Sequence, residues 1–182
     1  MKQLFFLGLL LMMLPANAQT NLIKNGSFEN EFIDWRGEES AMISPYEKKS
    51  GKSGANITQF VDAEWKALDQ IISIPKNTFA VECSVWMKTD EVETQKEAYK
   101  AGAVILEFTD AVEKQISTEN IAQATGSTEW THYKKIIKVP ADAKKIRIML
   151  ALAQTSGTVF FDDVKLITLT EEAYSKLNSD SK

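Results

Sequence analysis

The sequence predicts an all-β protein, specifically an antiparallel two-sheet β-sandwich. Two stretches, residues 79–88 and 144–153, alternate between apolar and polar side chains, as half-buried strands do. Turn-forming residues such as those of 50–54 and 125–127 separate these stretches from further apolar ones. Strand and helix patterns do not alternate along the chain, which favours a sandwich over a parallel sheet with crossover helices.

The individual strands follow from the same pattern. Within 79–88 the apolar face is formed by Phe79, Val81, Cys83, Val85 and Met87. Within 144–153 it is formed by Ile146, Ile148, Leu150 and Leu152. Five further stretches rich in Ile, Val and Phe are expected to be strands: 55–61, 67–74, 103–109, 133–139 and 158–168.

Helical character is confined to two stretches. Residues 91–100 fit either a helix or a charged loop. Thr170 is suited to cap a short helical turn over 170–177, within a polar tail that extends to residue 182. We therefore expect one domain over 19–169, followed by this tail.

Residues 1–18 have the pattern of a signal peptide. Lys2 precedes an apolar run from Leu4 to Leu14, and Ala16-Asn17-Ala18 forms a small-residue cleavage site. The apolar run is shorter than a membrane span, so membrane insertion is not expected. The protein is expected to be exported, either to the periplasm or out of the cell.

Charge and cysteine content restrict the partners and the chemistry. The chain carries 21 basic and 25 acidic residues, and removal of Lys2 with the signal peptide makes it more acidic. No basic excess is available to neutralise phosphates, so nucleic acid is not an expected partner. Cys83 is the one cysteine, which rules out an intramolecular disulfide, and its apolar phase predicts a buried, inert thiol.

Two segments near the chain ends place a carboxylate among residues that are expected to be buried. They are 21–30, which contains Glu29, and 158–166, which contains Asp162. Asp162 shares the strand phase of Phe160, Val164 and Leu166, so its side chain is expected to point inward. A buried carboxylate needs a cation, hydrogen bonds or a proton. We expect Glu29 and Asp162 to share one hard cation, and backbone hydrogen bonds or lysine partners are the alternative.

The order of several motifs resembles the calcium-containing β-jelly-roll carbohydrate-binding modules of families 4, 9, 16 and 22, which have a galactose-binding-like fold. Asn25-Gly-Ser-Phe-Glu29 with Trp35 is similar to the opening strand of these modules, and Ser50-Gly-Lys-Ser-Gly54 is similar to their glycine-containing loop. Phe161-Asp-Asp-Val-Lys-Leu166 is similar to their closing strand. The resemblance covers residues 21–168.

The resemblance implies a structural calcium and a polysaccharide or oligosaccharide ligand. The expected calcium ligands are the side chains of Glu29 and Asp162 and the carbonyl oxygens of Ser27 and Lys52. Oxygen-only ligation suits calcium.

A sugar site needs an aromatic ring on a solvent-facing surface, with polar groups beside it. Trp86 lies on the polar phase of its strand, and Trp65 lies in a polar stretch. The other candidates for hydrogen bonding or stacking are Arg147, Glu107, Asp69 and Tyr46. The alternative for Trp86 is packing beneath the 89–102 segment. Trp35 and Trp130 are expected in the core.

Catalysis is not expected. The chain has a single histidine, His132, and no nucleophile elbow, phosphate loop or zinc motif. The leading hypothesis is a secreted, non-catalytic carbohydrate-binding module, with a separate glycoside-degrading enzyme or a surface protein as a further partner. A jelly-roll polysaccharide lyase or hydrolase is one alternative, because two carboxylates suffice for glycoside hydrolysis. A structural or adhesion module that binds protein is the other.

Overall fold

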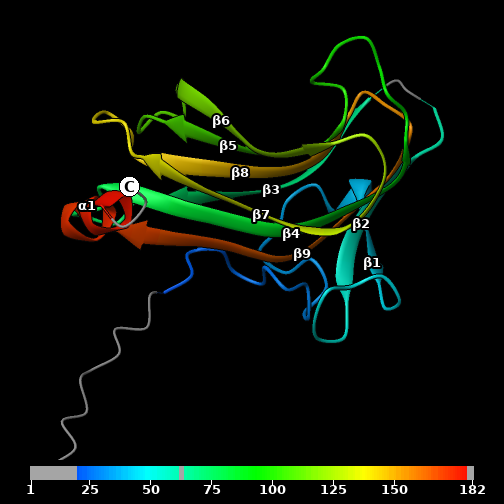
Figure 1. The fold of residues 1–182 in the computed structure, drawn as a ribbon, viewed down its shortest axis with the longest axis horizontal. Coiled ribbons are helices and arrows are strands. Elements are labelled where there is room, and N and C mark those ends of the chain that lie inside the picture. The colour runs from blue at the N-terminus through cyan, green and yellow to red at the C-terminus, as the bar shows by residue number, and fades with distance from the viewer. Residues whose placement is uncertain (1–19, 62–63, 180–182) are drawn as a thin grey trace, which may run out of the picture.

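The computed structural model describes residues 20–61 and 64–179, so the expected signal peptide lies outside the described residues. Two antiparallel sheets lie face to face (Figure 1). The five-stranded sheet has the order β1 (Met42–Ser44), β2 (Gly54–Gln59), β9 (Gly157–Leu169), β4 (Ala80–Val92), β7 (Gly126–Lys138). The four-stranded sheet has the order β3 (Trp65–Ser73), β8 (Lys145–Ala153), β5 (Gly102–Thr109), β6 (Gln115–Ala124). The predicted sandwich is confirmed.

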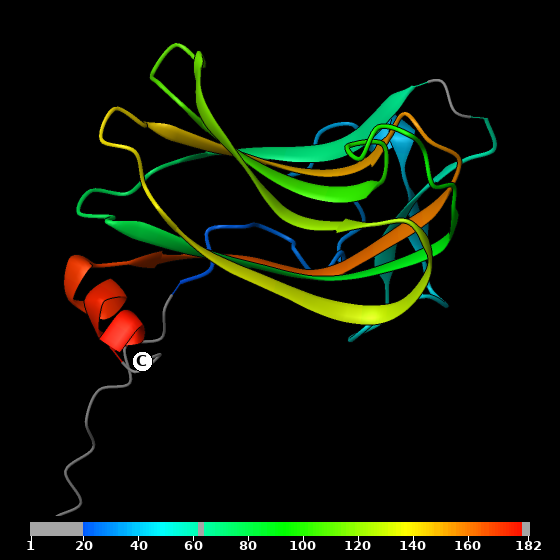
Figure 2. The same cartoon turned by 45° about the horizontal axis from the view of Figure 1, so that its top comes forward.

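The sequence does not predict β1 or β6. In β6 the residues Ser117 to Asn120 are polar on both phases, and its register with β5 shifts twice, so the two-residue period is broken. Only Thr125 separates β6 from β7, where Gly126 with φ 71° allows the chain to bend from one sheet into the other (Figure 2).

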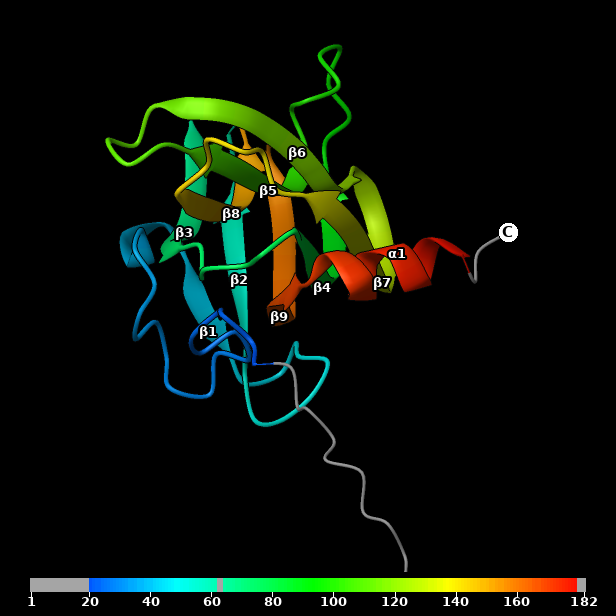
Figure 3. The ribbon, with the colours of Figure 1, turned by 90° about the vertical axis from the view of Figure 1, so that its left-hand side faces the viewer.

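Three further predictions concern the N-terminal segment, the connection after β4 and the C-terminal helix. An opening strand over 25–29 is wrong, because these residues form turns, and an isolated bridge between Asn21 and Ile167 joins this region to β9. Residues 93–101 are a connection without helix, which favours the charged-loop alternative. Thr170 does cap the C-terminal helix α1 (Glu171–Ser179), since its Oγ1 accepts a hydrogen bond from Ala173 N at 3.3 Å. The helix α1 lies at one end of the sandwich (Figure 3).

The hydrophobic core lies between the two sheets. The predicted apolar faces of β4 and β8 supply much of it, and Ile146, Ile148, Leu150 and Leu152 are all fully buried. Each such side chain contributes about 1.5–3 kcal/mol through burial. Cys83 is buried as expected, and burial raises the pKa of its thiol to about 12. Trp35 is also in the core, stacked on Phe28 with ring centroids 5.3 Å apart.

A β-bulge in β9 changes the face on which Asp162 lies. Asp163 has φ 50°, and the register with β4 shifts between the pairs Ser84–Lys165 and Trp86–Asp162. Phe161 and Val164 therefore both face the core, whereas Asp162 faces outward beside Trp86. The unbroken alternation expected from the sequence is wrong here. Asp162 is nevertheless 0% exposed, because the 45–53 connection between β1 and β2 covers it.

None of the described helices is both long and apolar enough to span a membrane.

Leu150→Ala is expected to lower the free energy of unfolding by about 2–5 kcal/mol, because it leaves a cavity between the sheets. Val112→Ala, at a side chain that is 82% exposed, is the matched control and should stay within about 0.5 kcal/mol of the parent. Urea unfolding measures both. Similar losses for the two variants would contradict the assignment of the core.

Candidate functional site

The register of the four-stranded sheet places three of the predicted sugar-site residues on one outer face. Trp65 lies opposite Ala153, Ile71 opposite Arg147, and Arg147 opposite Glu107. Side chains of directly opposed residues point to the same side. We call this the β8 surface, defined by Trp65, Ala67, Asp69 and Ile71 of β3, Arg147, Met149, Ala151 and Ala153 of β8, and Ala103, Ile105 and Glu107 of β5.

A network of paired charges occupies one end of the β8 surface. Asp69 is 7% exposed and accepts hydrogen bonds from Arg36 Nε at 3.0 Å and from Arg147 Nη2 at 3.3 Å. Arg147 Nη1 lies 3.8 Å from a carboxylate oxygen of Glu107. The two guanidinium groups and the two carboxylates balance one another, so this end presents directional hydrogen-bonding groups without a net charge.

Arg36 reaches this network through the backbone. Its N–H and C=O exchange hydrogen bonds with those of Asp69, both at 3.0 Å, as an isolated antiparallel bridge on the free edge of β3. A cavity of about 190 Å³ lies over the network and is lined by Arg36, Ile71, Glu107, Thr109, Glu113 and Arg147. At its rim Glu113 pairs with Lys145 at 2.8 Å, and this hydrogen bond lowers the pKa of the Glu113 carboxyl.

Aromatic rings lie at the other end of the β8 surface. Trp65 is 43% exposed and Tyr99, in the 93–101 connection, is 58% exposed. Between the two ends, the small side chains of Ala103 and Ala151 and the larger one of Met149 are all buried. From Trp65 to Ile71 the strand spans roughly 20 Å, which is long enough for an oligosaccharide to contact both ends.

Trp86 lies on the outer face of the opposite, five-stranded sheet. Its ring packs against His132 with centroids 4.9 Å apart, and Lys49 Nζ lies 4.0 Å from the ring centroid. It is half-buried by the 45–53 connection, rather than by the 89–102 segment. Trp130 is also half-buried on this face, 6.5 Å from Phe160, so its expected place in the core is wrong. Tyr46 is 90% exposed on the 45–53 connection, away from the β8 surface.

The two carboxylates expected to bind calcium contact the same short stretch of backbone. Asp162 accepts hydrogen bonds from the N–H groups of Lys49 and Ser50, at 2.8 and 2.9 Å, and from its neighbour Asp163 at 2.7 Å. Glu29 Oε1 accepts from the N–H groups of Lys52 and Ser53, at 2.8 and 3.2 Å. The two ends of the chain therefore meet at residues 49–53, as the cation hypothesis requires.

The groups around these carboxylates include oxygen ligands that suit a calcium ion and backbone N–H groups that do not bind one. Within the described residues no group of three or more His, Cys, Asp or Glu side chains gathers at one point. The carboxylates of Glu29 and Asp162 are oxygen donors of the kind that calcium prefers, with carbonyl oxygens in the same backbone stretches. The contacts present are N–H donors, which compensate the negative charges without a metal.

Burial raises the pKa of the Asp162 carboxyl, and its three backbone N–H partners act in the opposite direction. Beside Glu29, Gly51 has φ 61°, and a Cβ there would lie 2.2 Å from Glu29 Oε1. Any larger residue at position 51 would displace the Glu29 carboxylate from the loop.

A family model described as a carbohydrate-binding domain matches residues 20–157. The chain belongs to this family of carbohydrate-binding domains. The predicted resemblance is therefore confirmed, and the family is one of non-catalytic binding modules. Comparison of the sequence with curated proteins finds no match.

Solved structures of low sequence identity share the fold. TmCBM61, in complex with β-1,4-galactotriose, is 19% identical with a TM-score of 0.58, and the match covers 83% of this chain and 100% of that one. The CBM22-1 xylan-binding domain of Paenibacillus barcinonensis Xyn10C is 13% identical, with a TM-score of 0.58 and coverage of 85% and 98%. The enzymatically active domain of bacteriophage CBA120 tailspike protein 4 is 15% identical, with a TM-score of 0.65. This chain spans only 21% of its length, and the match covers 82% of this chain.

Sequence reasoning does not identify Arg36 or Tyr99, which lie beside the β8 surface and contact Asp69 and Gln154 respectively. No local sequence pattern points to Arg36, because its role depends on the backbone bridge that joins it to Asp69 of β3. A weak pattern points to Tyr99, since it is the one aromatic ring in the charged stretch 91–100.

Asp162→Asn is expected to lower the free energy of unfolding by about 1–3 kcal/mol, because the amide places a donor against backbone N–H groups.

The raised pKa means that folded Asp162 takes up a proton at higher pH than it does in the unfolded chain. The stability of the parent, relative to Asp162→Asn, should therefore rise as pH falls through the folded-state pKa and decline as pH rises through it. Urea unfolding with chelator, from neutral to acidic pH, measures this, and parallel pH profiles would contradict it.

Proposed function

We propose that the protein is an exported, non-catalytic module that binds an oligosaccharide or polysaccharide on the β8 surface. The observation that carries the proposal is the presence of an exposed Trp65 ring and the Arg36–Asp69–Arg147–Glu107 network on one face. Sugars stack their apolar faces on aromatic rings and exchange hydrogen bonds through their hydroxyls, so both kinds of group are needed on one surface.

The proposed ligand is a neutral glycan. The charges of the network are paired, so no cation is left over to select a uronic acid or a sulfate. Two structural neighbours support glycan as the ligand class, since one is a complex with β-1,4-galactotriose and the other is a xylan-binding domain. The proposed location of the protein, in the periplasm or outside the cell, rests on residues 1–18.

Trp65→Ala and Arg147→Ala are each expected to weaken binding to the preferred neutral polysaccharide by at least about tenfold, because each removes one part of the surface. Trp86→Ala is the matched control, since it removes an equal ring from the opposite sheet and should leave binding unchanged. A panel of galactan, xylan and acidic polysaccharides, followed by calorimetry, measures this, with thermal unfolding as a check of folding.

The same panel tests the alternatives. Loss of binding with Trp86→Ala but not with Trp65→Ala would move the site to the five-stranded sheet. Release of reducing or unsaturated ends would favour a lyase or hydrolase, although Asp69 and Glu107 are both engaged in ion pairs with Arg147. Absence of any glycan binding would favour a structural or adhesion module.

We also propose a structural calcium between Glu29 and Asp162, with the carbonyl oxygens of Ser27 and Lys52 as the remaining protein ligands. It is supported by the juxtaposition of the two carboxylates on residues 49–53. Bound calcium would neutralise two nearby negative charges and tie the N-terminal segment to β9.

Removal of calcium by a chelator is expected to lower the Tm by several degrees, because a ligand that binds only the folded state stabilises it. Glu29→Gln should lower the Tm of the untreated protein and abolish its response to chelator. Differential scanning calorimetry together with metal analysis of the purified protein measures this. An unchanged melting curve and no bound metal would contradict the proposal.

A further inference from the structure

The free edge of β3 offers unused backbone hydrogen-bonding groups. Among the strands of the described residues, β3 pairs only with β8, so it is an edge strand of the four-stranded sheet. At Asp69 the N–H and C=O point away from β8 and bond to Arg36. Because these directions alternate along an antiparallel strand, Ile71 and Ser73 also point their N–H and C=O groups to the free side. Within residues 20–61 and 64–179, no backbone hydrogen bond is formed by the N–H of either residue on that side.

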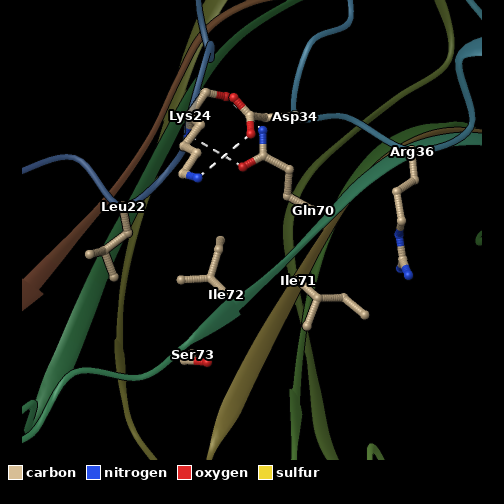
Figure 4. A pocket seen from close by; sticks show the side chains of 8 residues that line it. All are labelled: Leu22, Lys24, Asp34, Arg36, Gln70, Ile71, Ile72 and Ser73. Atoms are coloured by element: carbon tan, nitrogen blue, oxygen red, sulfur yellow. Dashed lines mark hydrogen bonds and ion pairs between the residues drawn. The ribbon is translucent and has the colours of Figure 1, made fainter.

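A cavity of about 370 Å³ lies against this open edge (Figure 4). Its lining residues are Leu22, Lys24, Asp34, Arg36, Gln70, Ile71, Ile72 and Ser73. Two other parts of the chain pass this edge without pairing to residues 71–73. At the first, residues 22–24, the Gln70 side chain accepts a hydrogen bond from Lys24 N at 3.2 Å and donates one to Lys24 O at 2.6 Å, so the Lys24 backbone bonds to this side chain instead of to the β3 backbone. The other passage, at 34–36, pairs with β3 only at Asp69.

The lining indicates which kind of molecule fits. Lys24 pairs with Asp34 at 3.6 Å, and Arg36 pairs with Asp69, so the cavity has no unbalanced charge. Leu22, Ile71 and Ile72 supply its apolar surface, and no aromatic ring is among the lining residues. A sugar would therefore lack a ring to stack on. Two N–H and two C=O groups, repeated about 7 Å apart along an edge, instead match the backbone of an extended peptide.

We propose that the Ile71–Ser73 edge of β3 binds an extended segment of another polypeptide, which adds to the four-stranded sheet as a further strand. The open stretch lies between the bridge at Asp69 and Pro75, which has no N–H, so only Ile71 and Ser73 are available. Such a short edge, flanked by residues 22–24 and 34–36, suits a flexible tail or loop better than the edge of a second folded copy. Peptide binding at this edge does not rest on the proposed glycan function, although Arg36 and Ile71 line both cavities.

The test uses blocked hexapeptides of alternating sequence, (Thr-Val)₃, (Lys-Val)₃ and (Glu-Val)₃, added to the mature protein. At saturation by at least one peptide, exchange of the Ile71 and Ser73 amide protons is expected to slow at least tenfold, whereas exchange of the Ile72 amide, which lies in the β8 ladder, stays the same. The same peptide, N-methylated on the alternate amides that would face β3, should give no protection. Hydrogen exchange followed by NMR measures each amide separately.

Ser73→Pro and Ser73→Ala form the matched pair of variants. Proline removes the free N–H at a position where it serves no bond in the fold, whereas alanine keeps it. Binding should be at least tenfold weaker for Ser73→Pro and unchanged for Ser73→Ala, with equal glycan binding by both, because Ser73 lies outside the β8 surface.

Several results would overturn the proposal. They are no protection of Ile71 and Ser73 by any of the peptides, equal protection by the N-methylated peptide, or equal binding by the proline and alanine variants. Protection of these amides by an oligosaccharide would assign the cavity to the glycan site instead. Protection that rises with protein concentration alone, together with dimer formation in sedimentation, would assign it to a second copy of this chain.

Discussion

The hydrogen bonds from the 49–53 backbone to Asp162 and Glu29 are the contacts on which the arrangement of the chain ends depends. Residues 20–37 form no regular strand, so they have no ladder of their own to hold them. They are instead tied down at separate points, by Glu29 at the 49–53 loop and by the Gly26 carbonyl, which accepts from Val164 N at 2.9 Å. The stacked rings of Phe28 and Trp35 then anchor the segment in the core. Hydrogen bonds to the exposed Glu29 and to the buried Asp162, together with a small aromatic cluster, thus replace strand pairing.

The anchoring of Phe28 and Trp35 also positions Arg36 at the edge of the four-stranded sheet. Because Trp35 is fixed, the next residue, Arg36, reaches the free edge of β3 and completes the charge network around Asp69. An arginine paired with a mostly buried carboxylate loses much of its rotational freedom, so its remaining N–H groups are held in place before any ligand arrives. The β8 surface therefore depends on contacts made at the chain ends, although neither Glu29 nor Asp162 belongs to it.

The two outer faces of the sandwich differ in how their aromatic rings are used. On the five-stranded sheet, Trp86 packs on His132 beneath Lys49, and Trp130 lies near Phe160, so these rings are engaged within the protein. On the β8 surface, Trp65 and Tyr99 are more exposed and flank small side chains. The open edge of β3 borders the same surface, which places the proposed glycan and peptide sites side by side at Arg36 and Ile71.

By itself the sequence determined the fold class, the strands with regular alternation and the family. It also determined that Arg147 and Glu107 lie off the core, because a two-residue period is a local property of the chain, and that Trp65 lies in a polar stretch. Only the tertiary structure decided which outer face each of these residues occupies, since strand order comes from long-range pairing that periodicity does not encode. It separated Trp86 from Trp65, brought Arg36 to Asp69, and turned Asp162 outward through one bulge residue. A single extra residue in a strand reverses the side of every residue after it, and no local pattern reveals that reversal.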